Sequence, residues 1–405
     1  MVGSGSLFGS TAVTAVLGFA YWSLIARTAA PASVGPASTL ISALTLLGTI
    51  GMFGIGTMLI SELSQDPGKA RTLLPASLAA AGLLSLVLAV LFAVVASWLS
   101  PTLRASLASP ANLGLFIAGV TLSAVTLVFD QASLGLQIAP VQLWRNTLFA
   151  AVKITLIPMV ILAGGSSWSI TATWILGLVL SCTIVVRPLR RLQILSAQLP
   201  RLGALRGLGW ATAHHNTLNL ALSVPRMAIP VVVGLLEPGE PTAVFYAAWM
   251  IAGVLYAIPT HLATTLFAIA AGDLDALRSK TRLTVTASLA IGAIAIPPVA
   301  LLAEPVMLVF GPAYAAGAGC LIVLVLLYPT QVVKQHYAAI LRARGQVRRA
   351  GIVCSVVGAA EMLAAVAGAI RADITLVAQL QGAVLAVTSL FLLPAVVSAC
   401  RAARR

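Results

Sequence analysis

The most constraining feature of this sequence is a series of long segments that contain no charged residue. A helix that crosses a bilayer needs about 20 apolar residues, because roughly 30 Å of hydrocarbon is divided by about 1.5 Å of rise per residue. Several charge-free segments exceed that length: 28–61, 72–103, 105–129, 241–272, 283–303, 305–333 and 374–400. None shows the apolar/polar alternation of a membrane barrel strand. The sequence therefore predicts an all-α integral membrane protein.

Composition supports this class and excludes others. The chain is 60% hydrophobic and 8% charged, whereas soluble domains carry about 25% charged residues. The net charge of +14 fits basic cytoplasmic loops better than a nucleic-acid partner. The four cysteines lie in or beside apolar segments without close pairing, so neither a disulfide nor a metal site is expected.

Combining the long and short apolar segments predicts about twelve transmembrane helices. The first has no basic segment before it, so we expect a retained span rather than a cleaved signal peptide. The predicted spans are 6–26, 38–61, 75–99, 112–134, 146–165, 168–187, 210–236, 242–268, 283–303, 316–339, 350–370 and 374–399.

The distribution of lysine and arginine predicts the orientation. With both termini in the cytoplasm, 18 of the 24 basic residues fall on the inner side, including Arg145 and Arg342 in inner loops. Three lie outside, at Arg27, Arg104 and Arg371. The remaining three lie within spans. This bias supports a topology with both termini inside, and we expect the cytoplasmic membrane as the location.

The longest polar connection, 188–209, divides the chain into two predicted six-helix lobes, 1–199 and 200–405. Spacings in the two lobes match. Asp66 and Asp273 close the second and eighth spans, and Asp130 and Lys334 begin corresponding hairpins. Because both lobes start on the same side of the membrane, we expect a parallel repeat with a pseudo-twofold axis along the membrane normal.

No Walker, Rossmann, HExxH or GxSxG motif occurs, and no loop is long enough for a soluble catalytic domain. We therefore expect neither an enzyme nor a cofactor. His214 and His215 are adjacent on one helix and point to different faces, so they do not predict a metal site.

A polar stripe on the seventh predicted span is the main candidate substrate site. At about 100° per residue, one face carries Thr212, His215, Asn216, Asn219, Ser223 and Arg226. A charge at a helix centre costs roughly 2.5–3.5 kcal/mol on insertion scales. The stripe either lines a hydrated cavity, which we favour, or bonds another helix in a dry core. We expect Arg226 to be the main anion contact; the competing hypothesis pairs it with Glu361 as a structural lock.

Other charges within the predicted spans extend this candidate site. Lys153 is a second candidate substrate contact, and Asp130, Lys334, Gln335 and Glu361 are candidate gating or coupling residues. Lys153 and Lys334 could instead reach the cytoplasmic interface along their aliphatic stems. Asp130 and Lys334 are predicted to approach each other across the pseudo-twofold axis. Three bases against two acids predict a positive cavity, which suits an anionic substrate such as a lipid-linked phosphate or pyrophosphate.

Three segments carry a resemblance to a known family. They are YWSLIARTAAPASVGPASTLISALTLLGTIGMFGIGTMLISEL at 21–63, AVFYAAWMIAGVLYAIPTHLATTLFAIAAGD at 243–273 and AEPVMLVFGPAYAAGAGCLIVLVL at 303–326. The chain resembles the polysaccharide-biosynthesis and O-antigen flippases of the multidrug/oligosaccharidyl-lipid/polysaccharide exporter superfamily. The likeness covers nearly the whole chain. It rests on the pattern of glycine, proline and aromatic positions rather than on one diagnostic motif.

The resemblance implies two six-helix lobes around a cavity that opens alternately to each side. It implies that lipid-linked oligosaccharide or polysaccharide precursors are flipped or exported without ATP hydrolysis, with membrane lipids and the pathway's glycosyltransferases or polymerase as partners. The predicted spans do not include the two further C-terminal helices of the lipid II flippase branch, so a peptidoglycan precursor is the less expected substrate. The alternatives are a cation-coupled multidrug antiporter of the same fold and a non-transport role, either a membrane scaffold or a membrane-bound glycosyltransferase.

Overall fold

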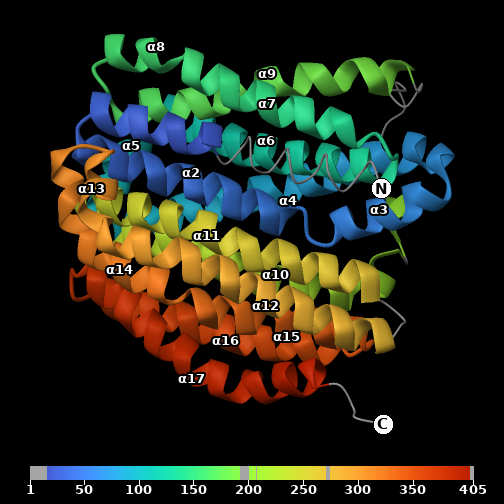
Figure 1. Cartoon of the computed structure of the whole chain (residues 1–405). Coiled ribbons are helices and arrows are strands. Elements are labelled where there is room, and N and C mark those ends of the chain that lie inside the picture. Colours follow the sequence, from blue (N-terminus) through green and yellow to red (C-terminus); the bar gives the residue numbers. More distant parts are fainter. Residues whose placement is uncertain (1–15, 192–199, 207, 271–273, 402–405) are drawn as a thin grey trace. The chain divides into compact units, whose positions relative to one another are not determined.

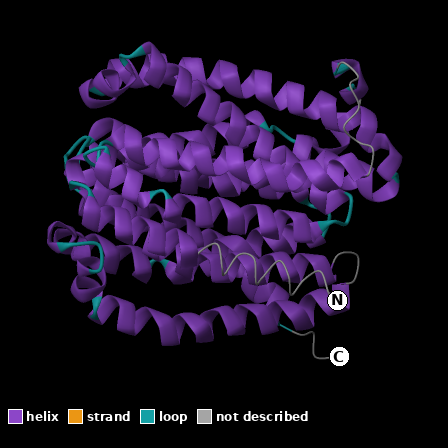
Figure 2. Ribbon diagram, turned by 90° about the horizontal axis from the view of Figure 1, so that it is seen from above, coloured by secondary structure: helices purple, strands orange, loops and turns teal. Residues whose placement is uncertain are grey.

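The computed structural model describes residues 16–191, 200–206, 208–270 and 274–401. Within these ranges the regular structure is entirely helical, and Figure 2 shows helices joined by short loops. Eleven helical segments in the described ranges are long and apolar enough to cross a membrane. The predicted first span, 6–26, begins outside the described residues, and the chain is helical over 16–28. The prediction of an all-α, multi-pass membrane protein is confirmed.

The described chain forms two compact units. The first unit extends to Asn216 and includes Pro238–Glu240. After the helix over 16–28, its helices are α2 (Pro31–Gly51), α3 (Ile55–Gln65), the 3-10 turn η1 (Pro67–Lys69), α4 (Ala70–Leu99), α5 (Pro101–Leu107), α6 (Pro110–Gly135), α7 (Ala139–Thr155), α8 (Ile157–Leu162), α9 (Ser167–Arg191) and the 3-10 turn η2 (Leu202–Leu205). Figure 1 draws them in blue to green.

Helix α6 is the centre of the first unit, because it packs on α2, α3, α4, α7 and α9. Glycines allow the backbones to approach closely: a Cβ added at Gly48 would lie 2.7 Å from the Ser123 hydroxyl, and one at Gly135 would lie 2.7 Å from the Leu59 carbonyl oxygen. Small residues serve the same purpose between membrane helices generally. The predicted span 38–61 is interrupted between α2 and α3, where Gly54 adopts a left-handed φ of 76°.

The second unit comprises Thr217–Glu237 and Pro241–Arg405. Its helices are α10 (Leu208–Leu236, from Thr217 onward), α11 (Glu240–Ala270), α12 (Leu274–Leu301), α13 (Ala303–Leu308), the 3-10 turn η3 (Pro312–Gly317), α14 (Ala318–Leu326), α15 (Tyr328–Ala343), α16 (Val347–Ala369) and α17 (Ile374–Cys400). Helix α17 packs on α12, α14, α15 and α16. It approaches α16 closely at Gly368, where an added Cβ would lie 2.6 Å from the Val377 Cα.

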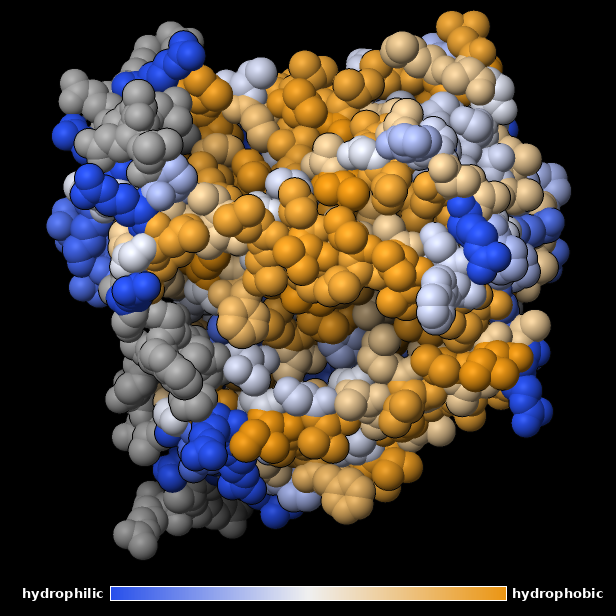
Figure 3. All heavy atoms as spheres, turned by 180° about the vertical axis from the view of Figure 1, so that it is seen from behind, coloured by the Kyte–Doolittle hydropathy of each residue, from blue (hydrophilic) through white to orange (hydrophobic). Residues whose placement is uncertain are grey.

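Many large apolar side chains are exposed along the predicted spans. Trp98 on α4 is 82% exposed, and Phe391 on α17 is 78% exposed. On the face drawn in Figure 3, hydrophobic residues gather over the middle of the helices and hydrophilic residues gather towards the ends. Water would penalise such a surface by about 25 cal/mol per Å² of apolar area, whereas lipid would not.

Candidate functional site

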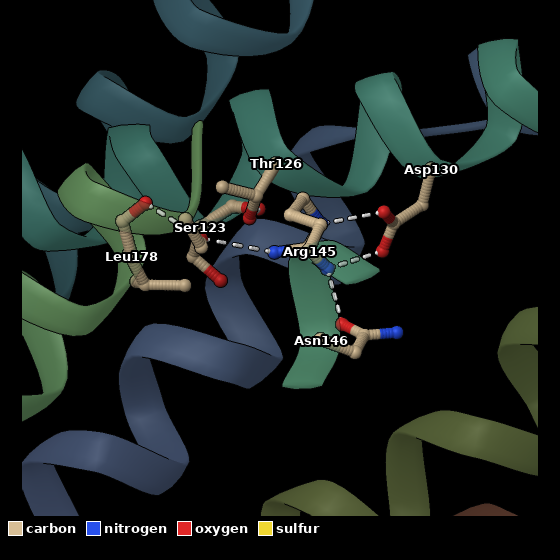
Figure 4. Close-up of polar contacts among 7 residues, drawn as sticks. Ser123, Thr126, Asp130, Arg145, Asn146 and Leu178 are labelled. Atoms are coloured by element: carbon tan, nitrogen blue, oxygen red, sulfur yellow. Dashed lines mark hydrogen bonds and ion pairs between the residues drawn. The ribbon is translucent and has the colours of Figure 1, made fainter. Parts of the chain in front are cut away.

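A buried ion pair joins α6 and α7 in the first unit. Asp130 and Arg145 are each 5% exposed. The Arg145 guanidinium donates to both carboxylate oxygens of Asp130, with Nε–Oδ1 and Nη2–Oδ2 distances of 2.7 and 2.5 Å. It also donates to the Asn146 side-chain oxygen at 2.6 Å and to the Ser181 hydroxyl at 3.5 Å. Figure 4 shows this fork-like geometry, which holds the Asp130 carboxylate in place.

The predicted place of Arg145 in an inner loop is wrong. Helix α7 begins at Ala139, several residues earlier than the predicted span, so Arg145 lies inside the helix. The sequence feature that indicates this pair is the placement of an acid before a short helical hairpin and an arginine after it. Because Arg145 compensates its charge, Asp130 has a partner within its own unit. The approach of Asp130 to Lys334 stays a prediction.

Lys153 lies in an aromatic cage formed by three side chains of the first unit. Its ammonium nitrogen is 3.7 Å from the ring centroid of Trp174, 4.1 Å from that of Phe149 and 5.0 Å from that of Tyr21. Lys153 is 3% exposed, so it does not reach the interface as the alternative interpretation required. The Tyr21 hydroxyl is 2.8 Å from that of Thr173, which holds one wall of the cage. Ring faces attract cations by about 0.5–2 kcal/mol each.

A second buried ion pair lies in the second unit. The Lys334 ammonium on α15 is 2.8 Å from Glu361 Oε1 on α16. The amide nitrogen of Gln381 on α17 lies 3.5 Å from Glu361 Oε2. Lys334 is 7% exposed, and Glu361 and Gln381 are each 2% exposed. Glu361 therefore pairs with Lys334 in this structure, and Lys334 does not extend to an interface.

Arg226 lies near this pair but is not its partner. It belongs to α10, is exposed, and has no ion pair or hydrogen bond to its guanidinium within the part of the chain that the structure describes. Its backbone oxygen accepts a hydrogen bond from the Trp249 indole at 3.2 Å. A small cavity of about 20 Å³, close to the space one water needs, connects its surroundings with the ion pair. The lining residues are Leu222, Arg226, Trp249, Tyr256, Thr260, Gln331, Lys334, Gln335, Glu361 and Gln381.

The other members of the predicted stripe differ in their surroundings. Asn219 accepts a hydrogen bond at 2.6 Å from Arg342, which lies in the last turn of α15 rather than in a loop. Ser223 is half-buried. The side chain of His215 lies outside the described residues. The stripe therefore has at least one fixed polar contact, between α10 and α15.

Several polar residues of this cavity were not predicted. Gln381 is one, and its side-chain carbonyl oxygen is buried with no hydrogen-bond partner among the described residues. A glutamine in the middle of an otherwise apolar span was the available signal. The described residues contain no group of three or more histidine, cysteine or acidic side chains able to hold a metal ion.

Comparisons with known proteins place the fold. The lipid II flippase MurJ, in an inward closed conformation, matches with a TM-score of 0.71 at 14% identity, over 98% of this chain and 87% of that one. An inward-facing multidrug resistance MATE family transporter of the MOP superfamily matches with a TM-score of 0.66 at 14% identity, over 95% of each chain. The chain has the fold of the multidrug/oligosaccharidyl-lipid/polysaccharide exporter superfamily.

An outward-facing multidrug transporter of the MATE family shows the same exporter fold, with a TM-score of 0.60 at 15% identity over 97% of this chain and 94% of that one. No protein-family model and no curated protein matches the sequence. These solved structures are transporters and flippases rather than enzymes. The exporter fold agrees with the resemblance found in the sequence, and it leaves the substrate to be argued from the polar residues themselves.

Proposed function

We propose that this chain flips or exports lipid-linked oligosaccharide or polysaccharide precursors across the cytoplasmic membrane by alternating access. The exporter fold supports a transporter, and it is shared with a lipid II flippase. The observation that carries the substrate class is Arg226, an exposed residue within a predicted span whose guanidinium has no ion pair or hydrogen bond among the described residues. A planar guanidinium offers paired donors to phosphate oxygens.

The charge balance around the cavity also favours an anion. Arg226 and Lys334 carry two positive charges, and Glu361 carries one negative charge that Lys334 already compensates. One positive charge therefore remains, on Arg226. A phosphate or pyrophosphate would supply both the counter-charge and the acceptors that this guanidinium lacks. Asn219 and Ser223 lie two turns and one turn before Arg226 on α10 and would lead the phosphate to it.

A cation-coupled multidrug antiporter is the second candidate, favoured by the likeness to MATE transporters. Such a protein needs an acid within its spans that can release one cation and take another. The two acids within the predicted spans, Asp130 and Glu361, are each engaged by a basic side chain of their own unit. For this reason we favour the anionic substrate.

The test is complementation of a strain that lacks this gene, scored for exported glycan and for protein level in the membrane. Arg226→Ala should nearly abolish export at unchanged protein level, because an apolar residue lowers the cost of insertion. Arg226→Lys should retain part of the activity, since it keeps the charge and loses the fork. Arg371→Ala, which removes an exposed arginine from the α16–α17 turn, is the matched control. Normal export by Arg226→Ala at wild-type abundance would contradict the proposal.

A further inference from the structure

A large groove runs along the surface of the second unit, apart from the Arg226 cavity. It is bounded by α12, α15 and α17 and has a volume of about 1010 Å³. Its wall is apolar: Val285 and Leu289 come from α12, Val332 and Val333 from α15, and Val396 from α17, among others. The Arg226 cavity shares none of these residues.

Both charged residues of the groove lie at one end. Arg282 precedes the apolar lining residues of α12, and Arg401 follows those of α17. Cys400, which directly precedes Arg401, lies close enough to Arg282 to be affected by its charge, so the two arginines lie at the same end of the groove. From this end the apolar wall extends about 10–12 Å along each helix, at about 1.5 Å per residue from Arg282 to Leu289 and from Arg401 back to Leu393. Half of the hydrocarbon thickness is about 15 Å, so the groove fits within one leaflet.

The surroundings of the groove indicate a lipid environment. Leu289 and Leu393 on its rim are 46% and 42% exposed, and Leu283 and Leu390 on the same two helices are 61% and 69% exposed. Both groove arginines are exposed, and the described residues provide neither with an ion pair. None of the described residues that line the groove is acidic. An occupant must therefore combine hydrocarbon along the wall with negative charge at the end that holds Arg282 and Arg401.

We propose that this groove is a binding site for an anionic membrane phospholipid. The phosphate lies between Arg282 and Arg401, and one acyl chain lies along the valines of α12, α15 and α17. Arginine forks bind phosphate oxygens in pairs, and basic pockets between membrane helices bind anionic headgroups in the same way. The predicted orientation places the two arginines on the cytoplasmic side, so the lipid belongs to the inner leaflet.

The first test measures lipid retention on the full chain in neutral detergent by native mass spectrometry, with phosphatidylglycerol and phosphatidylcholine as probes. Wild type should retain phosphatidylglycerol more strongly. Arg282→Gln and Arg401→Gln should each weaken this binding about fivefold, equivalent to about 1 kcal/mol per arginine, and the double variant should bind both lipids equally. Arg371→Gln, which removes the same charge outside the groove, should behave as wild type.

Two further measurements distinguish a lipid bound in the groove from a lipid adsorbed non-specifically on the positive charges. Val333→Phe fills the apolar wall and keeps both arginines, and it should also weaken phosphatidylglycerol binding. In the unmutated chain, phosphatidylglycerol should slow maleimide labelling of Cys400 in the groove and leave labelling of Cys182 in the first unit unchanged. This arm does not depend on any variant folding.

The proposal is overturned if the double arginine variant keeps its preference for phosphatidylglycerol, if Val333→Phe binds as wild type does, or if labelling of Cys400 is insensitive to lipid. It is also overturned if a polyprenyl phosphate displaces phosphatidylglycerol at equal concentration, because the groove would then belong to the transported substrate.

Discussion

The ion pair between Lys334 and Glu361 predicts a specific pattern of stability changes. Replacing either residue alone should destabilise the protein strongly, whereas replacing both should not. At 2.8 Å and an effective dielectric constant of about 20, the attraction between the two charges is about 6 kcal/mol. Desolvation of the two ions offsets most of this attraction, so the pair as a whole contributes little. Removing one partner leaves a buried charge without compensation, and we expect Lys334→Met or Glu361→Leu to lower the free energy of unfolding by about 3–5 kcal/mol.

The double variant Lys334→Met with Glu361→Leu should recover most of this loss, because no uncompensated charge remains. Unfolding followed by tryptophan fluorescence in detergent would give the three free energies of a double-mutant cycle. The surface pair Lys69–Glu62 is a matched control, with a shorter distance of 2.6 Å but side chains 45% and 21% exposed. Its disruption should cost less than about 1 kcal/mol.

The reasoning would be refuted if Lys334→Met cost no more than the surface control. It would also fail if the stabilities of the two single variants added without coupling. A large loss in Arg226→Met together with a small loss in Lys334→Met would instead support the structural lock between Arg226 and Glu361.

Three other predictions concern different parts of the chain. Burial, together with the nearby charge of Asp373, raises the pKa of the Glu237 carboxyl from its ordinary 4.5 to about 7. The folded protein then holds this proton more tightly than the unfolded chain does, so stability should fall as pH rises from about 4.5 to 7. Glu237→Gln should be more stable than wild type by about 1–2 kcal/mol at pH 8 and equal to it near pH 4. A pH profile of thermal unfolding that Glu237→Gln leaves unchanged would count against this. Gly368→Ala should destabilise the protein by about 1–3 kcal/mol because its Cβ would collide with the α17 backbone, whereas Gly253→Ala, with open space around it, should show no loss in the same unfolding assay. A reporter fused after Arg405 should be active only in the cytoplasm, and activity outside would reverse the proposed orientation.

The spans could be predicted from the sequence because bilayer thickness alone sets their length. The predicted segment 374–399, for example, corresponds to α17 at Ile374–Cys400. The bounds of helices that are interrupted by glycine or proline were harder to predict. The interruption between α2 and α3 depends on the left-handed backbone of Gly54, which a run of several glycines does not identify.

The partners of the embedded charges could be predicted less well than their positions. From the sequence, either Arg226 or Lys334 could have been the ion-pair partner of Glu361. Hydropathy could not decide between them, because it does not specify which helices are neighbours or how each helix is rotated about its axis. The cage around Lys153 draws on three separate helices, whose aromatic residues look ordinary in the sequence. A charge within a span therefore indicates that compensation is required, and only packing shows which group provides it.

The positive charge that compensates Glu361 is covalently part of the protein, because it is carried by the Lys334 side chain. This has a thermodynamic consequence for Glu361. A free counterion occupies an acid according to its bulk concentration, by mass action. A tethered one has a fixed local concentration and does not diffuse away. Diluting or exchanging the salts on either side of the membrane leaves the compensation of Glu361 unchanged, because the counterion of this carboxylate is encoded in the polypeptide rather than supplied by the medium.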